Sequence, residues 1–433
     1  MVTSEKERKY RAISLLSICF SSIRVFVGPI TLLVLAKKLS SEELGFYYAF
    51  FSLTAMAQLL EVGMTGVLKQ YYSHAYESTG DKENYDKISS YFLFSLYWYF
   101  ALSIIFFFMG VIVSYVMFKD YDGLIQWNAA WYLLLLISCI SLMLLPLNAM
   151  LDGTQKQNML IRANIVSQLI VAISLWVAIY SGLGLYSMAL SQFAGIISFL
   201  SSIYLLNSCS WNFYDFKRKE VVFKKVFFEL WPLLKKTSVV WFLGYFYWNG
   251  FNIISFKYLG PEIAGCIGIS IAIMRAGQNI AVSILNSQMT LYANNIAKGF
   301  FKEAKIIFDR YFIMSLLLLL IGYGVFYLLY FLKPNFFLFK KVLPLEQMIY
   351  VSIFFIFTFI ISGVEVFTRC FKVEKFVITQ VINSILTPSL FLLGIHLQMK
   401  YFILPIASVF VVSILTISIS RRFYSGYTYE KNN

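Results

Sequence analysis

The stretch Ile313–Leu332 reads IMSLLLLLIGYGVFYLLYFL, twenty residues without a charged side chain. An α-helix needs about 20 mainly apolar residues to cross the hydrocarbon core of a bilayer. Similar runs recur through the whole chain of 433 residues, of which 59% are hydrophobic and 13% charged. A soluble chain is typically about 45–50% apolar and about 25% charged. The sequence therefore predicts a polytopic helical membrane protein with no soluble domain hidden in it.

Apolar windows on both sides of this run predict twelve transmembrane helices. Their approximate ranges are 12–36, 44–67, 90–118, 128–151, 161–181, 185–208, 231–256, 263–290, 311–332, 346–368, 376–395 and 402–420. A transmembrane barrel would instead show alternating segments of about ten residues. The predicted fold class is an all-α integral membrane protein, with twelve transmembrane helices in two six-helix bundles around a central cavity.

Lysine and arginine residues predict the orientation of these helices. With a cytoplasmic N-terminus, the inside segments carry 26 of the 36 basic residues and the outside loops carry 8. The bias places both termini in the cytoplasm and the protein in the cytoplasmic (inner) membrane. The net charge of +14 is then explained by basic residues that face the anionic inner leaflet. Nucleic acid is therefore not an expected partner.

The chain is predicted to consist of two related halves. An N-terminal six-helix bundle spans 1–208, a cytoplasmic basic linker spans 209–230, and a C-terminal six-helix bundle with a short cytoplasmic tail spans 231–433. An offset of 220 residues pairs Lys37 with Lys257, Leu39 with Leu259, Glu42 with Glu262, Gly45 with Gly265 and Gln58 with Gln278. Two six-helix halves that both start inside form a parallel repeat about an axis along the membrane normal.

Two short motifs resemble a known family. The stretch Leu39-Ser-Ser-Glu-Glu-Leu-Gly-Phe-Tyr, followed by Leu59-Leu-Glu-Val-Gly-Met-Thr-Gly, resembles the first hairpin of polysaccharide flippases of the O-antigen and capsule type, and Leu259-Gly-Pro-Glu-Ile-Ala-Gly is similar to the same loop. These flippases belong to the superfamily of the multidrug and toxin extrusion (MATE) transporters and the lipid II flippase. The resemblance implies a substrate, an undecaprenyl-diphosphate-linked oligosaccharide that is moved to the outer leaflet.

Two arginines lie near the middle of their spans. Arg24 is 13 residues from both Arg11 and Lys37, and Arg275 follows Glu262 by 13 residues. An ionisable residue at this depth is a functional hypothesis by default. Two guanidinium groups at matching depth predict an anionic substrate group, and a diphosphate fits because arginine binds phosphate oxygens bidentately. The lipid II flippase family similarly uses arginines in its first and eighth helices. The alternative is that each arginine pairs with a carboxylate or with helix carbonyls.

Polar side chains on the same helices, and on the second helix, are predicted to line the cavity or to act in gating. They are Ser21, Gln58, Glu61, Asn279 and Asn286. Glu61 also matches an acidic position of the resembled family. From the sequence it can pair with Arg24, or bond only to Lys69 or water.

The seventh helix carries four residues on one face that could contact sugar rings. They are Trp241, Tyr245, Trp248 and Asn252. In a chain that is 19% aromatic, the alternative is that this face serves packing or contacts lipid.

The remaining reactive side chains predict no chemistry. The five cysteines, Cys19, Cys139, Cys209, Cys266 and Cys370, include no C-x-x-C pair and predict neither a disulfide framework nor a zinc site. Neither His74 nor His396 has other metal-ligating residues near it in the sequence. Glu365 and Arg369 lie one helical turn apart and predict an ion pair. No G-x-x-x-x-G-K-[ST] loop occurs. We expect no metal, no cofactor and no enzymatic activity.

Two rival functions stay open from the sequence. A MATE-type ion-coupled exporter of small cations would favour acids over arginines at mid-membrane. A membrane polymerase or ligase of lipid-linked sugars would need a large outer loop, and no predicted outer loop exceeds about fifteen residues. The expected partners of the leading hypothesis are the lipid-linked oligosaccharide, membrane lipids and other polysaccharide assembly proteins, and the expected state is a monomer.

Overall fold

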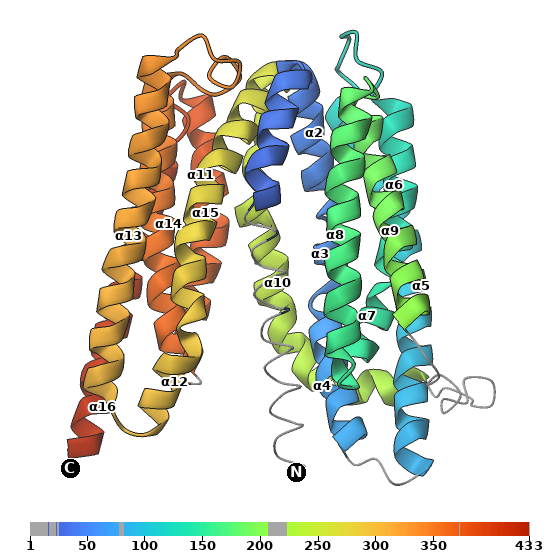
Figure 1. Ribbon diagram of the computed structural model, residues 1–433, viewed down its shortest axis with the longest axis vertical. Coiled ribbons are helices and arrows are strands. Elements are labelled where there is room, and N and C mark those ends of the chain that lie inside the picture. Colours follow the sequence, from blue (N-terminus) through green and yellow to red (C-terminus); the bar gives the residue numbers. More distant parts are fainter. Residues whose placement is uncertain are drawn as a thin grey trace. The chain divides into compact units, whose positions relative to one another are not determined.

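The computed structural model describes Leu16, Ile23 and residues 26–77, 82–206, 223–371 and 373–432 (Figure 1). A helix over residues 26–38 comes first. The helices that follow are α2 Ser41–Thr54, α3 Ala57–Glu61, α4 Met64–Glu77, α5 Lys82–Phe118, α6 Asn128–Met143, α7 Leu145–Gly153, α8 Gln157–Tyr180, α9 Tyr186–Leu206, α10 Phe223–Leu259, α11 Pro261–Ser287, α12 Met289–Ala297, α13 Phe301–Leu332, α14 Leu345–Arg369, α15 Val377–His396 and α16 Ile403–Asn432. No strand occurs in these ranges. The predicted all-helical fold is confirmed.

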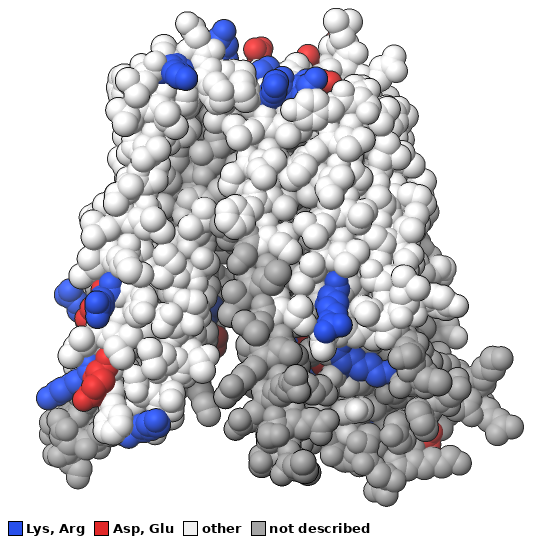
Figure 2. Space-filling model, viewed as in Figure 1, with Lys and Arg blue, Asp and Glu red and all other residues white. Residues whose placement is uncertain are grey.

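Each of the twelve predicted windows overlaps a helix of the described chain. Nine of the described helices are long and apolar enough to cross a membrane, or ten if the bent pair Ser41–Glu61 and Met64–Tyr76 is one span. Charged side chains gather toward the two ends of the spans, with a nearly uncharged band between them (Figure 2). The band includes the outer face of α13, where Ile313, Leu317 and Ile321 are exposed. Such an apolar exterior suits contact with lipid rather than water.

The chain divides into two compact units. Unit 1 comprises Met1–Leu39 and Ala49–Phe242, and unit 2 comprises Ser40–Tyr48 and Leu243–Asn433. Residues 209–222 of the predicted linker lie outside the described residues, and its remaining part, from Phe223 onward, is already helical. The start of α2 belongs with unit 2 although the rest of that helix belongs with unit 1.

Unit 1 holds the first part of α10 through aromatic packing. The ring of Phe223 lies 4.5 Å from that of Phe94, and the ring of Phe227 lies 5.8 Å from that of Trp98. Leu230 on the same helix is fully buried in a cluster formed with α4, α5 and α7. These apolar contacts fix the beginning of α10 across one end of unit 1, as Figure 1 shows.

Unit 2 contains a very close helix crossing at the start of α11. Gly260, with φ 83°, precedes α11, and Pro261 is its first residue. A Cβ placed on Gly45 of α2 would lie 2.0 Å from the carbonyl oxygen of Pro261, and a Cβ on Gly265 would lie 2.0 Å from that of Ser41. Only glycine permits such an approach of two backbones.

Candidate functional site

Arg275 is the centre of the candidate site in unit 2. It lies on α11, and its Cζ atom is 4.0 Å from the ring centroid of Trp248 on α10. A guanidinium over an indole face is attracted by the ring quadrupole, by about 0.5–2 kcal/mol depending on exposure. The stacking covers one face of the planar guanidinium and leaves its hydrogen-bond donors along the edge. The two helices thus position an arginine whose edge forms no hydrogen bond with the residues that the structure describes.

No carboxylate pairs with Arg275 among the residues that the structure describes, and no carbonyl oxygen there accepts a hydrogen bond from it. The alternative considered from the sequence, an arginine neutralised by a carboxylate or by helix carbonyls, is therefore not what the described part of unit 2 contains. An arginine inside a span is energetically costly without an anion or water. The arrangement can bind an anion bidentately.

Amide side chains follow Arg275 along α11. Asn279 and Asn286, both predicted to line the cavity, are exposed on this helix. Gln278 is only 3% exposed, and its Oε1 atom has no hydrogen-bond partner in the described chain. In the sequence, Gln278 stands out only as the repeat partner of Gln58, which is exposed on α3. A buried amide oxygen without a hydrogen-bond partner is uncommon. Gln278 is therefore a candidate functional residue that the sequence did not predict.

Three of the four residues of the predicted sugar-contacting face have described side chains, and these differ in exposure. Trp248 is partly exposed and stacks on Arg275. Tyr245 and Asn252 are buried at 2% and 9% exposure. The side chain of Trp241 lies outside the described part of the chain. Sugar contact therefore stays a prediction, and Trp248 is the described member of the face that combines exposure with a charged neighbour.

A second polar network in unit 2 was not predicted. The Tyr247 hydroxyl lies 3.2 Å from Thr358 Oγ1. Thr387 Oγ1 lies 2.7 Å from Asn383 Oδ1 and 2.9 Å from Ser408 Oγ. These hydrogen bonds connect α10 to α14 and α15 to α16. Isolated polar residues in apolar runs were the available signal, but only the tertiary fold shows which of them meet.

Glu61 of unit 1 caps a broken helix. Its Oε1 atom accepts the backbone N–H of Thr65 at 2.9 Å and the hydroxyl of Tyr99 at 3.2 Å. The break is formed by Val62 and Gly63, whose φ angles of 45° and 81° are left-handed. Glu61 is 9% exposed, so the carboxylate is satisfied by the start of α4 rather than by solvent. A negative group at this position also complements the helix dipole.

Other sequence hypotheses have mixed outcomes. Arg24 and Ser21 lie outside the described residues, so a joint site of the two arginines stays a prediction. Lys69, considered as a partner of Glu61, instead pairs with Asp152 at 2.5 Å. The predicted ion pair between Glu365 and Arg369 is present at 3.5 Å.

Comparison with known proteins supplies the fold. No protein family profile and no curated protein matches the sequence. The inward-facing conformation of a multidrug resistance MATE family transporter of the MOP superfamily matches with a TM-score of 0.70 and 12% identity, over 94% of this chain and 96% of that chain. The lipid II flippase MurJ in an inward closed conformation matches with a TM-score of 0.58 and 16% identity, over 96% and 87%. The MATE transporter ClbM in complex with Rb+ matches with a TM-score of 0.55 and 13% identity, over 94% of each chain.

The chain has the fold of the MATE-like transporters. The predicted arrangement of twelve transmembrane helices in two bundles is thereby confirmed. At identities of 12–16% the likeness concerns architecture, and it does not extend to a substrate. In this fold, α10 and α11, the predicted seventh and eighth spans, bring Trp248 and Arg275 together.

Proposed function

We propose that the protein is a flippase that moves an undecaprenyl-diphosphate-linked oligosaccharide from the inner to the outer leaflet of the cytoplasmic membrane by alternating access. The observation that carries the proposal is the guanidinium of Arg275, which lies inside a span, stacks on Trp248 and has no carboxylate partner in the described chain. The diphosphate is the group that this guanidinium binds. The protein acts as a monomer with both termini in the cytoplasm, and it catalyses no covalent step.

The chemistry of the site favours a diphosphate over a carboxylate or a neutral ligand. Phosphate oxygens match the fork of a guanidinium and form two parallel charge-assisted hydrogen bonds. The stacked indole holds the guanidinium plane, so less conformational entropy is lost when the anion binds. The apolar polyprenyl tail can remain in lipid while only the head enters the protein.

The second candidate is a MATE-type exporter of small molecules. The fold supports it, because a multidrug resistance transporter is among the matched structures. The site does not favour organic cations, since Arg275 would repel a positive ligand that approached Trp248. A polymerase or ligase has weaker support, because the matched structures are transporters and a lipid flippase.

Substitution of Arg275 tests the proposal. We expect Arg275→Ala to reduce export of the saccharide about tenfold or more, since a hydrogen bond to a charged group contributes about 1.5–3 kcal/mol and about 1.4 kcal/mol corresponds to a factor of ten. Arg275→Lys should remain impaired because lysine cannot form the planar bidentate pair. The readout is lipid-linked saccharide retained in the inner leaflet, measured together with the abundance of each variant in the membrane.

Arg310 provides the matched control. It lies on α13 of the same unit, directly before the predicted span 311–332, so Arg310→Ala removes the same charge away from Trp248. The proposal predicts normal export by this variant. Wild-type export by Arg275→Ala at normal abundance would contradict a role of Arg275 in substrate binding. A gene deletion that causes no retention of lipid-linked saccharide would contradict the flippase function itself.

A further inference from the structure

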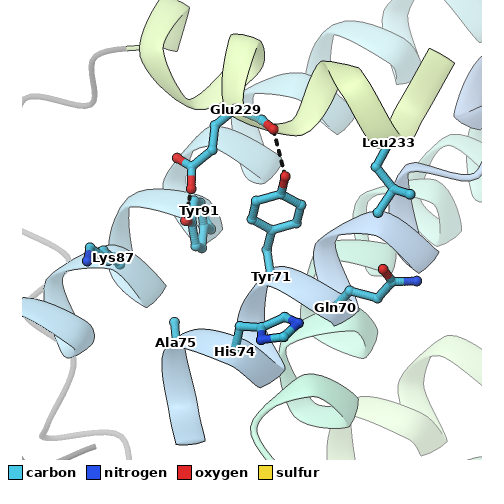
Figure 3. A pocket seen from close by; sticks show the side chains of 8 residues that line it. All are labelled: Gln70, Tyr71, His74, Ala75, Lys87, Tyr91, Glu229 and Leu233. Atoms are coloured by element: carbon cyan, nitrogen blue, oxygen red, sulfur yellow. Dashed lines mark hydrogen bonds between the residues drawn. The ribbon is translucent and has the colours of Figure 1, made fainter. Parts of the chain in front are cut away.

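Unit 1 contains a cavity of about 500 Å³ between α4, α5 and the start of α10. Its volume lies within the range of about 300–1,000 Å³ that is typical of small-molecule sites. It is lined by Gln70, Tyr71, His74, Ala75, Lys87, Tyr91, Glu229 and Leu233 (Figure 3). The segments that form it carry the basic residues of two predicted inside loops, so this end of unit 1 is the one predicted to face the cytoplasm. None of the functional residues predicted from the sequence lines it.

Glu229 is held in the cavity by two tyrosines. The hydroxyl of Tyr71 donates to the Glu229 backbone oxygen at 2.7 Å, and the hydroxyl of Tyr91 donates to Glu229 Oε1 at 2.6 Å. The two rings meet edge to face with centroids 5.8 Å apart. The second carboxylate oxygen of Glu229 points away from both tyrosines (Figure 3), and no described residue bonds to it. A fixed carboxylate therefore offers one oxygen as an acceptor for a ligand.

The other polar groups of the cavity complete a mixed set of donors and acceptors. Gln70 contributes an amide and His74 an imidazole, while Lys87 contributes an ammonium group. Sugar hydroxyls donate and accept hydrogen bonds at once, so they suit a site that presents both kinds of group. A phosphate suits it poorly, because the carboxylate of Glu229 would repel the phosphate. An acyl chain suits it poorly as well, because these polar groups would lose their hydrogen bonds to water.

We propose that this cavity binds the saccharide part of the lipid-linked substrate on the cytoplasmic side, before translocation. The proposal rests on the proposed flippase function and adds a recognition site for sugar. The tyrosine rings give the cavity flat apolar walls, and Glu229, Gln70 and Lys87 orient the hydroxyl groups. The cavity thus selects for the sugar, whereas Arg275 binds the diphosphate that all such substrates share.

Site-specific photocrosslinking in living cells tests the proposal. The photoreactive residue p-benzoylphenylalanine replaces Gln70 in the full-length protein, and the matched control replaces Ser73, an exposed residue of the same helix that does not line the cavity. Cells are labelled with [32P]phosphate, which marks the diphosphate of the substrate whatever its sugar is. Both variants must first be present in the membrane at the abundance of the unsubstituted protein. We expect label on the protein after irradiation at position 70 and much less at position 73.

Mild acid identifies which ligand carries the label. Acid cleaves the bond between an anomeric carbon and a phosphate, whereas glycerophospholipids keep their phosphate. If the crosslink runs through the sugar, acid leaves the sugar on the protein and releases the 32P with the polyprenyl diphosphate. Acid-labile label at position 70 supports the proposal. Acid-stable label would show that a phospholipid headgroup fills the cavity and would overturn it.

Substitution of Glu229 supplies a second, independent readout. Glu229→Gln keeps an oxygen that can accept the Tyr91 hydroxyl, so the packing of α10 on unit 1 is preserved. We expect acid-labile crosslinking at position 70 to fall about tenfold, because the hydrogen bond to a charged acceptor becomes one to a neutral amide. Unchanged crosslinking would overturn the assigned role of Glu229. If a deletion strain retains lipid-linked saccharide but neither position 70 nor position 73 acquires acid-labile label, the cavity proposal is wrong and the flippase proposal stands. If the deletion strain retains no such intermediate, both are wrong.

Discussion

Glu61 illustrates how one buried acid can be structural within a transport fold. Its carboxylate accepts the Thr65 N–H near the start of a helix that begins after a left-handed break, and the Tyr99 hydroxyl also lies 2.8 Å from Thr65 Oγ1. The described contacts of Glu61 thus lie at the bend of 47° between Ser41–Glu61 and Met64–Tyr76. The predicted role in gating would have to act through this bend.

We expect the stability of variants at this cap to follow a definite order. Glu61→Ala removes a helix cap, at about 0.5–2 kcal/mol, and leaves the Tyr99 hydroxyl with one partner fewer. Tyr99→Phe should cost about 1 kcal/mol, the typical net contribution of a hydrogen bond. Glu61→Gln should cost least because its amide oxygen can still accept the Thr65 N–H. Thermal unfolding of the purified protein in detergent measures the order.

Glu43 gives the matched control for this cap. Its Oε2 atom accepts the backbone N–H of Ser40 at 2.7 Å, and its own N–H donates to Ser40 Oγ at 3.0 Å, a capping box at an exposed helix start. Glu43→Ala should destabilise the protein less than Glu61→Ala because water can replace its hydrogen bonds. Equal losses for the two would contradict the argument from burial.

At the residue scale, sequence reasoning found the charged groups and one local ion pair, Glu365 with Arg369, but not the contacts of Arg275 and Glu61. Arg275 stood out because a charge is rare inside an apolar run. The contact with Trp248 and the capping role of Glu61 depend on which residues face each other across helices, and hydropathy carries no such information. Gly63, two residues after Glu61, was the available sign of a break, but an isolated glycine inside an apolar run is also tolerated in a continuous helix.

At the element scale, the sequence repeat acquires a structural meaning. The offset of 220 residues that pairs Gly45 with Gly265 also pairs Ser41 with Pro261. In the structure the two glycines and the two carbonyl oxygens meet reciprocally, each glycine against the carbonyl of the other segment. Equivalent residues of the two repeats that contact each other reciprocally are related by a local two-fold axis. The match of the two glycines in the sequence repeat therefore reflects close packing of the two helix starts and is not a chance match.

We expect Gly45→Ala and Gly265→Ala each to destabilise the protein by about 1–3 kcal/mol, the typical cost of overpacking. The added Cβ atom would lie 2.0 Å from a backbone oxygen, so the two helix starts must move apart. Gly324→Ala on α13 is the matched control, since nothing lies within 4 Å of its Cβ position. It should be neutral or stabilising by up to about 1 kcal/mol, because alanine favours helix over glycine. Equal thermal stability of all three variants would contradict the close crossing.

The helix boundaries were less predictable than the helices themselves. Hydropathy marked residues 231–256 as the seventh span because apolar length is what a bilayer requires. The helix begins earlier, at Phe223, because Phe223 and Phe227 find aromatic partners on α5. Packing against distant residues extends the helix into a segment whose lysines identify it, by composition alone, as a linker. For the same reason the cavity around Glu229 could not be found from the sequence.

At the scale of the whole molecule, the distribution of basic residues predicts the orientation of both units. Each unit has one exposed residue near each end of its spans at which a cysteine can be introduced. In unit 1 these are Leu124 and Gln155, and in unit 2 they are Lys340 and Lys298. The positive-inside rule places Leu124 and Lys340 outside the cell. A parallel repeat requires that both units have the same orientation in the membrane.

Labelling of single cysteines by a membrane-impermeant maleimide tests this orientation. We expect Leu124→Cys and Lys340→Cys to react in intact cells, whereas Gln155→Cys and Lys298→Cys should react only after the membrane is permeabilised. Cys19, Cys139, Cys209 and Cys266 are first replaced by serine. Cys370 can remain, because burial raises its pKa to about 11 and the thiolate is the form that reacts. At neutral pH its thiol is therefore protonated, and its labelling should rise only as the pH approaches that value. Labelling of Gln155→Cys in intact cells would reverse the orientation of unit 1, and opposite answers from the two units would contradict the parallel repeat.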